Sequence, residues 1–414
     1  MNIKEAILEI NLRNLSNNIQ QLKLLEFNKN KTIIAIIKSD AYGHGLLEVA
    51  QVLEKEGINF FGVIKLEDAI LLKNKLTSPK ILLLSGVDEK NISVAAAMDI
   101  SICVYDLNYL KAVYAAAKTA QKKILIHLKY DSGMSRLGFK DDELYKALDY
   151  IEEIRKNGNF LEFEGIFSHF SSAESDTDYT SFQLNNYKNI LKTIYNRKLT
   201  PLYRHISASS SMLSTEIKDD FSNSVRPGIS LYGINPINQQ VKSKNTAKHC
   251  NNKQTCDAGN LVLKPLMTLK TGIIQIKQIK KGCFVSYGKT FQAPRDMTIG
   301  IINAGYDNGI PRMLSNKGRV IINNQYADII GTITMNMTIV DMTEIENASL
   351  ENEAIILGES RCKKITIEEI AGYADTIPYE ICLNLGKSNK RIYINTIKSN
   401  ISANNTGNNN NNNN

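Results

Sequence analysis

Short apolar segments alternate with helical stretches between residues 33 and 226, and this alternation restricts the fold more than any other feature. The apolar segments have the length of buried strands. They are 33–38, 60–63, 81–84, 100–104, 124–129, 163–168, 203–206 and 224–226. The helical stretches between them are 46–56, 66–74, 107–118, 141–156 and 181–197. Eight strands with intervening helices predict an α/β protein built on a (β/α)8 barrel of the TIM class.

The character of the sequence changes after residue 236. Residues 237–260 are rich in Asn, Gln and Lys without periodicity, which predicts a polar insertion or linker. From 261 to 398, β-branched residues alternate with Gly and polar turns, so we expect a mostly β second domain. Residues 399–414 end in an asparagine run that cannot bury a core, and we expect disorder there. We therefore expect residues 1–236 to form the barrel domain. An alternative for its first residues is to pair with the second domain.

Composition argues against several classes of protein. The chain has 414 residues, 43% of them hydrophobic, which is enough for two domains. Its net charge of +8 comes from dispersed basic residues and only 7% of residues are aromatic, so we expect no nucleic-acid surface, while the mild excess of lysine favours small anionic ligands. The amino terminus lacks a signal-peptide pattern, and no apolar run approaches the roughly 20 residues that span a membrane.

The six cysteines are scattered along the chain. Cys103, Cys283 and Cys382 lie in apolar contexts that predict reduced thiols in the core, which favours a cytoplasmic protein. His249, Cys250 and Cys256 lie in the polar insertion without a second ligand pair at zinc-finger spacing, so we expect no metal site.

Lys38 stands at the carboxyl end of the first apolar segment, directly before a glycine-punctuated turn. Parallel strands bring their carboxyl-terminal residues to the face of a barrel that carries the chemistry. A lysine desolvated there has a lowered pKa and can attack a carbonyl as the free amine, so Lys38 is a candidate Schiff-base residue. Taken alone, such a lysine is more often structural, with its stem packed on the core.

Later strand ends add polar groups to the same face. Lys129 and Arg136 flank a glycine turn after the fifth strand, and this turn can fold Arg136 back over the site. His169 follows the sixth strand and, taken alone, is more often a satisfied core histidine. Residues 205–211 form a hydroxyl-rich turn able to bind an anion, and Gly228 permits a close backbone approach to phosphate.

These motifs together resemble the alanine racemases, pyridoxal-phosphate enzymes of fold type III. The likeness begins with Lys-Ser-Asp-Ala-Tyr-Gly-His-Gly at 38–45, which is similar to the family's cofactor-lysine motif. It continues in the family's order through 127–138, 285–291, 303–312, 331–337 and 376–380, and covers nearly the whole chain outside the insertion and the tail. The resemblance implies an isomerase that interconverts L- and D-alanine, supplies D-alanine for peptidoglycan and works as a homodimer.

The resemblance also implies which residues do the chemistry. Lys38 would bind pyridoxal 5'-phosphate and act as one catalytic base, and Tyr306 would be the opposite base, contributed by the second domain of the partner subunit. Arg136 would contact the cofactor phenolate and the substrate carboxylate, which the amide of Met335 would also meet. Lys129 occupies the position of a lysine that is often carbamylated in this family.

The cofactor-binding set implied by the resemblance has three parts. Phosphate would be held by Tyr42, Ser209, Tyr379 and the amides of Gly228 and Ile229. Arg226 would face the pyridine nitrogen, with His169 linking it toward Tyr306. Lys38 completes the set.

Two unlike bases suit the inversion of a stereocentre, since one proton must leave one face and another must return on the opposite face. Lysine and tyrosine side chains have reference pKa values of about 10, so the pKa of each base must be lowered for it to work near neutrality. An arginine at the pyridine nitrogen keeps its own charge and discourages protonation of the ring. This weakens the electron sink and favours racemisation over transamination.

Several positions depart from the family pattern. Ala208 replaces an asparagine, and Asp307-Asn308 follows the tyrosine where Ala-Asp is usual. Thr332 stands where an arginine is common and Glu174 where an aspartate is common, so we expect a salt bridge across the substrate entrance to be missing. Asn336 replaces a frequent aspartate. These changes leave the substrate range open.

Three alternatives therefore stand beside an alanine racemase. One is a broader racemase acting on serine or other small amino acids. Another is a non-catalytic pyridoxal-phosphate carrier, although such proteins lack the second domain that holds Tyr306. A decarboxylase of similar architecture would usually place a carboxylate, rather than Arg226, at the pyridine nitrogen.

Overall fold

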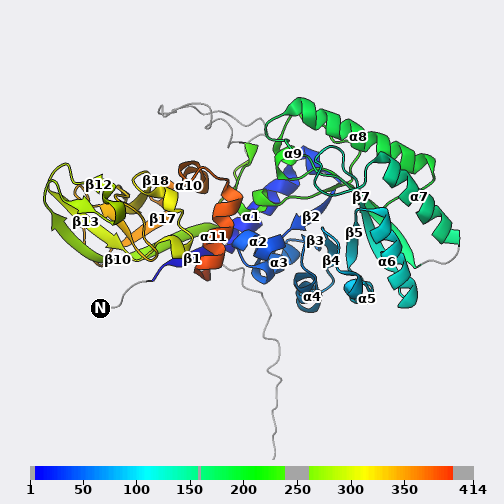
Figure 1. Cartoon of the computed structure of the whole chain (residues 1–414), viewed down its shortest axis with the longest axis horizontal. Helices are drawn as coiled ribbons and strands as arrows, with labels where there is room; N and C mark the ends of the chain where they lie inside the picture. The colour runs from blue at the N-terminus through cyan, green and yellow to red at the C-terminus, as the bar shows by residue number, and fades with distance from the viewer. Residues whose placement is uncertain (1–4, 157–159, 238–260, 395–414) are drawn as a thin grey trace, which may run out of the picture.

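The computed structural model describes residues 5–156, 160–237 and 261–394 (Figure 1). The predicted insertion, apart from Ile237, and the predicted tail lie outside these residues. The described chain forms a helix-covered barrel and a second, mostly β unit, so the predicted fold class is confirmed.

The barrel is an eight-stranded parallel sheet in the order β8-β7-β6-β5-β4-β3-β2-β9. Its strands are β2 (Thr32–Ile36), β3 (Phe60–Val63), β4 (Lys80–Leu83), β5 (Ser101–Val104), β6 (Ile124–Lys129), β7 (Leu161–Phe167), β8 (Tyr203–His205) and β9 (Ser224–Val225). The ring is joined between β8 and β9 by a bridge between Ala208 and Arg226, where the Arg226 amide donates to the Ser207 carbonyl at 3.0 Å. The carboxyl ends of all eight strands therefore meet at one mouth.

Helices cover the outside of the barrel (Figure 1). They are α1 (Leu12–Leu24), α3 (Leu46–Lys55), α4 (Leu66–Lys75), α5 (Ile92–Ala97), α6 (Leu107–Thr119), α7 (Asp141–Lys156) and α8 (Thr177–Asn196). The short α2 (Lys38–Gly43) and α9 (Ser209–Leu213) follow β2 and β8 at the barrel mouth. Asp106 and Asp176 are the N-cap residues of α6 and α8, and their carboxylates accept hydrogen bonds from the amides of Tyr109 and Tyr179. The sequence analysis did not predict α1, α5 or α9. The last two are short, with fewer turns than an apolar stripe needs.

The second unit is built on a nine-stranded sheet, whose main path is β15-β14-β17-β10-β1-β19. Its strands and the nearby hairpin are β1 (Ile7–Asn11), β10 (Met267–Ile279), β11 (Phe284–Val285), β12 (Phe291–Gln292), β13 (Met297–Ile302), β14 (Arg319–Ile322), β15 (Gln325–Asp328), β16 (Thr338–Asp341), β17 (Glu353–Ser360), β18 (Lys363–Ile365) and β19 (Lys390–Ile394). Two helices, α10 (Ile367–Tyr373) and α11 (Pro378–Ser388), complete it. β1 runs antiparallel to β10 and parallel to β19, so the amino-terminal strand pairs with the second unit.

The two units share one continuous apolar core. In Figure 1, α11 lies beside α1 and α2, where the units meet. Asn18 of α1 connects the barrel to the start of the second unit by hydrogen bonds, because its Nδ2 donates to the carbonyls of Leu231 (3.0 Å) and Lys264 (2.8 Å). The second unit is thus fixed against the side of the barrel that contains α2.

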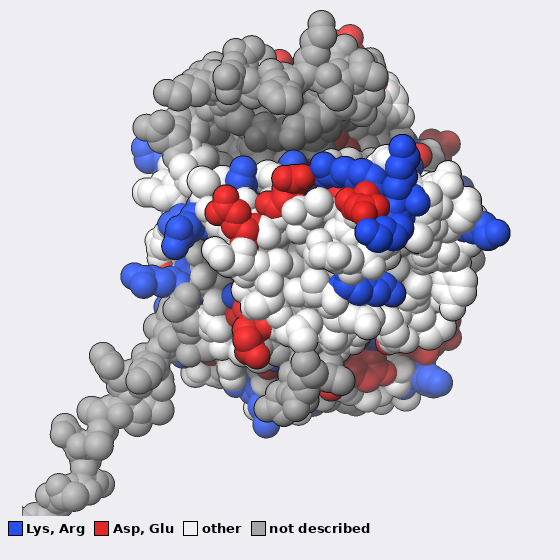
Figure 2. All heavy atoms as spheres, turned by 90° about the vertical axis from the view of Figure 1, so that its left-hand side faces the viewer, with Lys and Arg blue, Asp and Glu red and all other residues white. Residues whose placement is uncertain are grey.

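Two surface observations bear on the sequence predictions. The end of the second unit in Figure 2 shows basic and acidic side chains close together, without a large patch of one sign. No helix in the described ranges is long and apolar enough to cross a membrane.

Cys103 and Cys382 are buried as predicted, but the prediction for Cys283 was wrong: it is exposed, because its amide closes a surface turn on Lys280.

Candidate active site

Lys38 begins α2, and the four residues after it form a left-handed turn. Ser39, Asp40, Ala41 and Tyr42 all have φ between 51° and 57°. An L residue in this region costs about 1–2 kcal/mol, because its Cβ approaches the following carbonyl oxygen. A run of four non-glycine residues therefore needs support from its surroundings.

His44 supports this turn from inside. Its Nδ1 lies 3.0 Å from the carbonyl oxygen of Ala41 and 3.2 Å from that of Tyr42, and since carbonyls only accept, Nδ1 must carry the proton. Burial lowers the pKa of His44 to about 4, so the ring stays neutral. The ring also stacks on Tyr232 with centroids 4.4 Å apart.

The barrel mouth is strongly electropositive. Burial, followed by the charges of Arg136 and Arg226, lowers the pKa of Lys38. The pKa of Lys129 is also lowered, mainly by burial and then by Arg136, Arg226 and Lys38. Four cationic side chains from three strand ends therefore act on one another, an arrangement suited to an anionic ligand.

Arg136 reaches this cluster through a tight turn. Asp131 closes it by accepting hydrogen bonds from the amides of Gly133 (3.1 Å) and Ser135 (2.9 Å), and it also forms an ion pair with Lys140 at 2.9 Å. Ser135 has φ 55°, in the left-handed region. Sequence reasoning identified the glycine but not Asp131, although an Asx turn was readable from the Asp131-Ser-Gly pattern.

Arg226 is almost fully buried, and both of its Nη atoms contact acceptors. Its Nη1 contacts His205 at Nδ1 (2.5 Å) and at the carbonyl (2.8 Å). Its Nη2 donates to the carbonyls of Ser168 (2.6 Å) and Ile206 (3.0 Å) and lies 3.1 Å from His169 Nδ1. Burial lowers the pKa of Arg226 to about 10, so the guanidinium is still charged at neutral pH.

A chain of buried polar groups continues from Arg226 into the barrel interior. His205 Nε2 lies 3.0 Å from His127 Nδ1, and His127 Nε2 lies 3.1 Å from Glu164 Oε2. Ser101 donates to the same carboxylate oxygen at 2.5 Å. Sequence reasoning missed this chain because its members face inward from four different strands, and only the fold brings them together.

Ser209, Gly228 and Tyr42 form a compact cradle at the other side of the mouth. The Ser209 hydroxyl accepts hydrogen bonds from the amides of Gly228 (2.9 Å) and Ser230 (3.3 Å). A Cβ on Gly228 would lie 2.7 Å from the Tyr42 hydroxyl, so only glycine allows this approach. Ile229 begins the 3-10 turn η3 (Ile229–Tyr232) here.

Tyr379, at the start of α11, joins the cradle from the second unit. Its ring centroid lies 6.0 Å from that of Tyr42. Burial raises the pKa of Tyr379 to about 12 and also raises that of Tyr42, so both phenols remain protonated donors.

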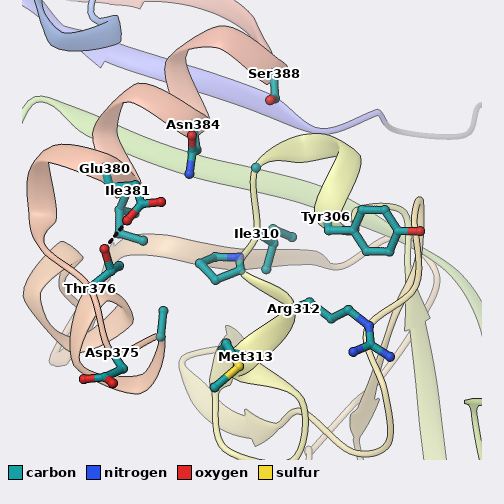
Figure 3. A pocket seen from close by; sticks show the side chains of 13 residues that line it. Tyr306, Ile310, Arg312, Met313, Asp375, Thr376, Glu380, Ile381, Asn384 and Ser388 are labelled. Carbon is teal, nitrogen blue, oxygen red and sulfur yellow. Dashed lines mark hydrogen bonds between the residues drawn. The ribbon is translucent and has the colours of Figure 1, made fainter. Parts of the chain in front are cut away.

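Tyr306 and Met335, the two remaining predicted residues, lie together on the surface of the second unit. Tyr306 starts η6 (Tyr306–Asn308), and its amide donates to the carbonyl of Thr334 (3.1 Å), next to Met335. Tyr306 is 43% exposed and Met335 54%. Tyr306 lines a surface pocket with Arg312 of η7 (Arg312–Leu314) and residues of α11, all from the range 306–388 (Figure 3). Lys38 does not line this pocket.

The positions that depart from the family pattern have local partners. Thr332 is buried, and its hydroxyl donates to the carbonyl of Tyr287 in η5 (Tyr287–Lys289) at 2.9 Å. An uncharged side chain therefore stands where an arginine is common. Asn336 Nδ2 lies 3.5 Å from Asp307 Oδ2. Ala208 donates its amide to Ser211 Oγ at 2.9 Å. Glu174 is exposed.

The comparisons with known proteins agree with this arrangement. The family model for the alanine racemase N-terminal domain matches residues 10–236, and the model for the C-terminal domain matches residues 266–393. The curated protein alanine racemase 2 of Caldanaerobacter subterraneus subsp. tengcongensis is 33% identical over 393 residues, covering 95% of both chains.

Solved structures show the same likeness. The alanine racemase of D-cycloserine-producing Streptomyces lavendulae superposes with a TM-score of 0.84 at 26% identity, covering 96% of this chain and 99% of that one. The Bartonella henselae alanine racemase, solved with covalently bound pyridoxal phosphate, gives 0.79 at 28% identity, covering 94% and 99%. The barrel mouth, the second unit and these full-length matches place the chain in the alanine racemase family, whose members interconvert L- and D-alanine.

Proposed function

We propose that the barrel mouth holds pyridoxal 5'-phosphate and that Lys38 and Tyr306 move the α-proton of alanine between its two faces. The observation that carries this proposal is the environment of Arg226: a charged, buried guanidinium whose two Nη atoms are both hydrogen-bonded, at the mouth that also contains an amine with a lowered pKa. Such a site is built to hold a specific anionic, aromatic ligand rather than to solvate a surface.

The residues present fit this cofactor. The cradle of Tyr42, Ser209 and Gly228 contains hydroxyl and amide donors and no carboxylate, as a phosphate requires, and Gly228 leaves room where any Cβ would collide. The Gly228 amide, which donates to Ser209 Oγ, would turn to the phosphate instead. Tyr379 and the Ile229 amide would add further donors. Lys38 would form the covalent link.

The bound cofactor would supply an electron sink that makes the α-proton of an amino acid removable. Arg226 would face the pyridine nitrogen and, as a cation that keeps its protons, leave that nitrogen unprotonated. His169 would orient Arg226 through the 3.1 Å contact. Arg136, and the amide of Met335, would bind the substrate carboxylate.

Lys38 would take or return the proton on one face, for which its lowered pKa is suitable. Tyr306 would act on the other face from the second domain of a partner subunit. Support for a homodimer comes from the exposed apolar side chains around Tyr306. Tyr287, Met313, Met335 and Met337 are each at least 45% exposed, and aromatic residues and methionine are typical of protein interfaces.

We also propose that Lys129 is carbamylated. Its lowered pKa favours the free amine, whose nitrogen attacks the carbon of CO2 and loses a proton to give an N-carboxylate. The new negative charge would lie among three cations and fix Arg136. A carbonyl signal from protein incubated with 13C-bicarbonate, absent in Lys129→Ala, tests this proposal.

In the cell, this activity would supply D-alanine for peptidoglycan, in the cytoplasm. The free cysteines of the described ranges, which include buried Cys103 and Cys382, are compatible with a reducing compartment. A broader racemase remains the second candidate, since uncharged Thr332 and the Asp307–Asn336 contact alter the second-domain surface near Tyr306.

The decisive experiment has two parts. Borohydride should fix the cofactor on Lys38, and a chiral product assay with a panel of L-amino acids should give D-alanine fastest. Label on another lysine would overturn the assignment of Lys38. A faster reaction with serine would favour the broader racemase.

A further inference from the structure

The left-handed turn of residues 39–42 contacts the second unit of the same chain on two sides. Left-handed residues normally occur singly, so a run of four must be held by tertiary contacts. Around the turn, the Ala41 amide donates to Ile37 (2.9 Å), the His44 amide to Ala41 (3.1 Å), the Gly45 amide to the Asp40 carbonyl (3.0 Å) and the Leu46 amide to the Asp40 carboxylate (2.8 Å). Contacts from outside the segment 37–46 add to these local bonds.

Arg391 of β19 provides the first of them. Its Nη1 forms an ion pair and hydrogen bond with the Asp40 carboxylate and also donates to the carbonyl of Gly43 at 3.2 Å. One guanidinium therefore binds both the middle and the end of the turn. Arg391 retains only 25% of its side-chain exposure, which makes this pair less screened than a fully exposed one.

Helix α11 and Tyr393 close the second side. A Cβ on Gly386 would lie 2.2 Å from the carbonyl oxygen of Gly43, and a Cβ on Gly43 would lie 2.7 Å from the carbonyl oxygen of Cys382. The two backbones are therefore in direct contact. Tyr393 fills the space at Gly45, where a Cβ would lie 2.0 Å from its hydroxyl.

We infer that Arg391 is a positioning residue that holds the left-handed turn through Asp40 and thereby fixes Lys38 and Tyr42 at the barrel mouth. The second unit thus supports the cofactor site of its own subunit, in addition to the surface it presents around Tyr306. The inference rests on the proposed function only in that Lys38 and Tyr42 bind the cofactor. The state of the turn itself can be measured without cofactor.

The first test is Arg391→Ala, measured in two ways. In cofactor-free protein, hydrogen–deuterium exchange of a peptide covering 37–47 should become faster, and in loaded protein the cofactor should be released faster. Losing support for one left-handed residue corresponds to a factor of roughly 5–30, and this is the size expected for both changes. Unchanged exchange would overturn the inference.

Arg319→Ala is the matched control. It removes the Arg319–Glu369 ion pair of 2.8 Å, which lies in the same unit and joins β14 to α10. It should leave both the exchange of 37–47 and cofactor release at wild-type rates. An equal effect of both substitutions would mean that Arg391 only stabilises the second unit as a whole, which contradicts a positioning role.

Ser39→Gly gives a rescue that a general loss of stability cannot mimic. Ser39 is exposed, and glycine occupies the left-handed region without the Cβ penalty. Added to Arg391→Ala, it should restore slow exchange and slow release to within a few-fold of wild type. Failure of this rescue would contradict the inference.

If Arg391→Ala does not fold, Asp40→Asn removes the same ion pair from the exposed side and should give the same acceleration, again reversed by Ser39→Gly. Absence of any acceleration in Asp40→Asn would also overturn the inference. Borohydride label elsewhere than Lys38 would refute the proposed function but leave the exchange result in cofactor-free protein interpretable.

Discussion

Inside the barrel, the Nδ1 atom of His127 and the Nε2 atom of His205 lie 3.0 Å apart, and this contact has only one consistent direction. Arg226 can only donate, so His205 Nδ1 accepts from it and His205 Nε2 carries the proton. His127 Nδ1 must then accept, and its Nε2 donates to Glu164. Burial and Arg226 hold the pKa of His205 well below its usual range, which keeps that ring neutral. The carboxylate of Glu164 thus sets both histidine tautomers and, through them, orients Arg226, the residue proposed to face the cofactor ring.

Glu164→Gln should therefore destabilise the fold by about 1.5–3 kcal/mol, the usual contribution of a hydrogen bond to a charged group. The amide keeps an acceptor for His127 but loses the charge. Urea unfolding measures the effect. Glu162→Gln, on the same strand, is the control: it removes an exposed ion pair with Lys123 and should cost under about 1 kcal/mol. Similar losses in both variants would contradict the role of Glu164.

The same substitution has a defined pH dependence. Burial alone would raise the pKa of Glu164, but hydrogen bonds from His127 and Ser101 and the charge of Lys80 lower it below its usual 4.5. Because the pKa of Glu164 is lower in the folded protein, its carboxylate stabilises the fold fully at pH values above 4.5, the pKa in the unfolded chain. This stabilisation is lost as the pH falls through the pKa of Glu164 in the folded state. The difference in unfolding free energy between wild type and Glu164→Gln should hence be constant above about pH 5.5 and shrink below pH 4.5. A constant difference down to pH 3 would rule out this linkage.

How much of this could be predicted from sequence differs between the fold and the site. The barrel follows from apolar segments whose period and length are local properties, and Lys38 follows from its position at a strand end. The left-handed turn after Lys38 could not be predicted, because its residues are not glycine and their conformation depends on Arg391, some 350 residues away in the chain. The chain from Arg226 to Glu164 likewise exists only once the strands are placed side by side.

Asn336 and Asp307 provide a prediction about the surface near Tyr306. Their side chains lie 3.5 Å apart, with the amide facing the carboxylate. Asn336→Asp would bring two negative charges together beside Tyr306, so kcat/KM for alanine should fall roughly 2–5-fold, as for an exposed charge pair. Asp307→Ala should restore it in the double variant, and added salt should reduce the loss. If Asn336→Ala lowers kcat/KM equally, charge is not the cause.

Tyr306→Phe should affect the two enantiomers unequally. Only the base on one face is lost, so α-deuterium exchange from one enantiomer of alanine should fall far more than exchange from the other. Because the covalent link is assigned to Lys38 and does not involve Tyr306, borohydride labelling of Lys38 should be unchanged. Equal losses for both enantiomers would count against two bases of different identity.

The arrangement of Lys38 and Tyr306 leads to a complementation experiment. Lys38 is at the barrel mouth, whereas Tyr306 lies exposed on the second unit. In the proposed mechanism, each complete site therefore takes Lys38 from one subunit and Tyr306 from its partner. Lys38→Ala and Tyr306→Phe homodimers should both be inactive. In a mixed dimer, one of the two sites carries both substitutions and the other carries neither.

Mixing the two variants in equal amounts under conditions of subunit exchange makes about half of the dimers mixed, so activity should recover to roughly one quarter of wild type. A double variant carrying both substitutions, mixed with wild type, is the matched control: its mixed dimers hold one damaged residue in each site and should add no activity. Native mass spectrometry establishes that exchange has occurred. If mixed dimers form and activity does not return, Lys38 and Tyr306 do not share a site across the interface, and the proposed dimer mechanism is wrong.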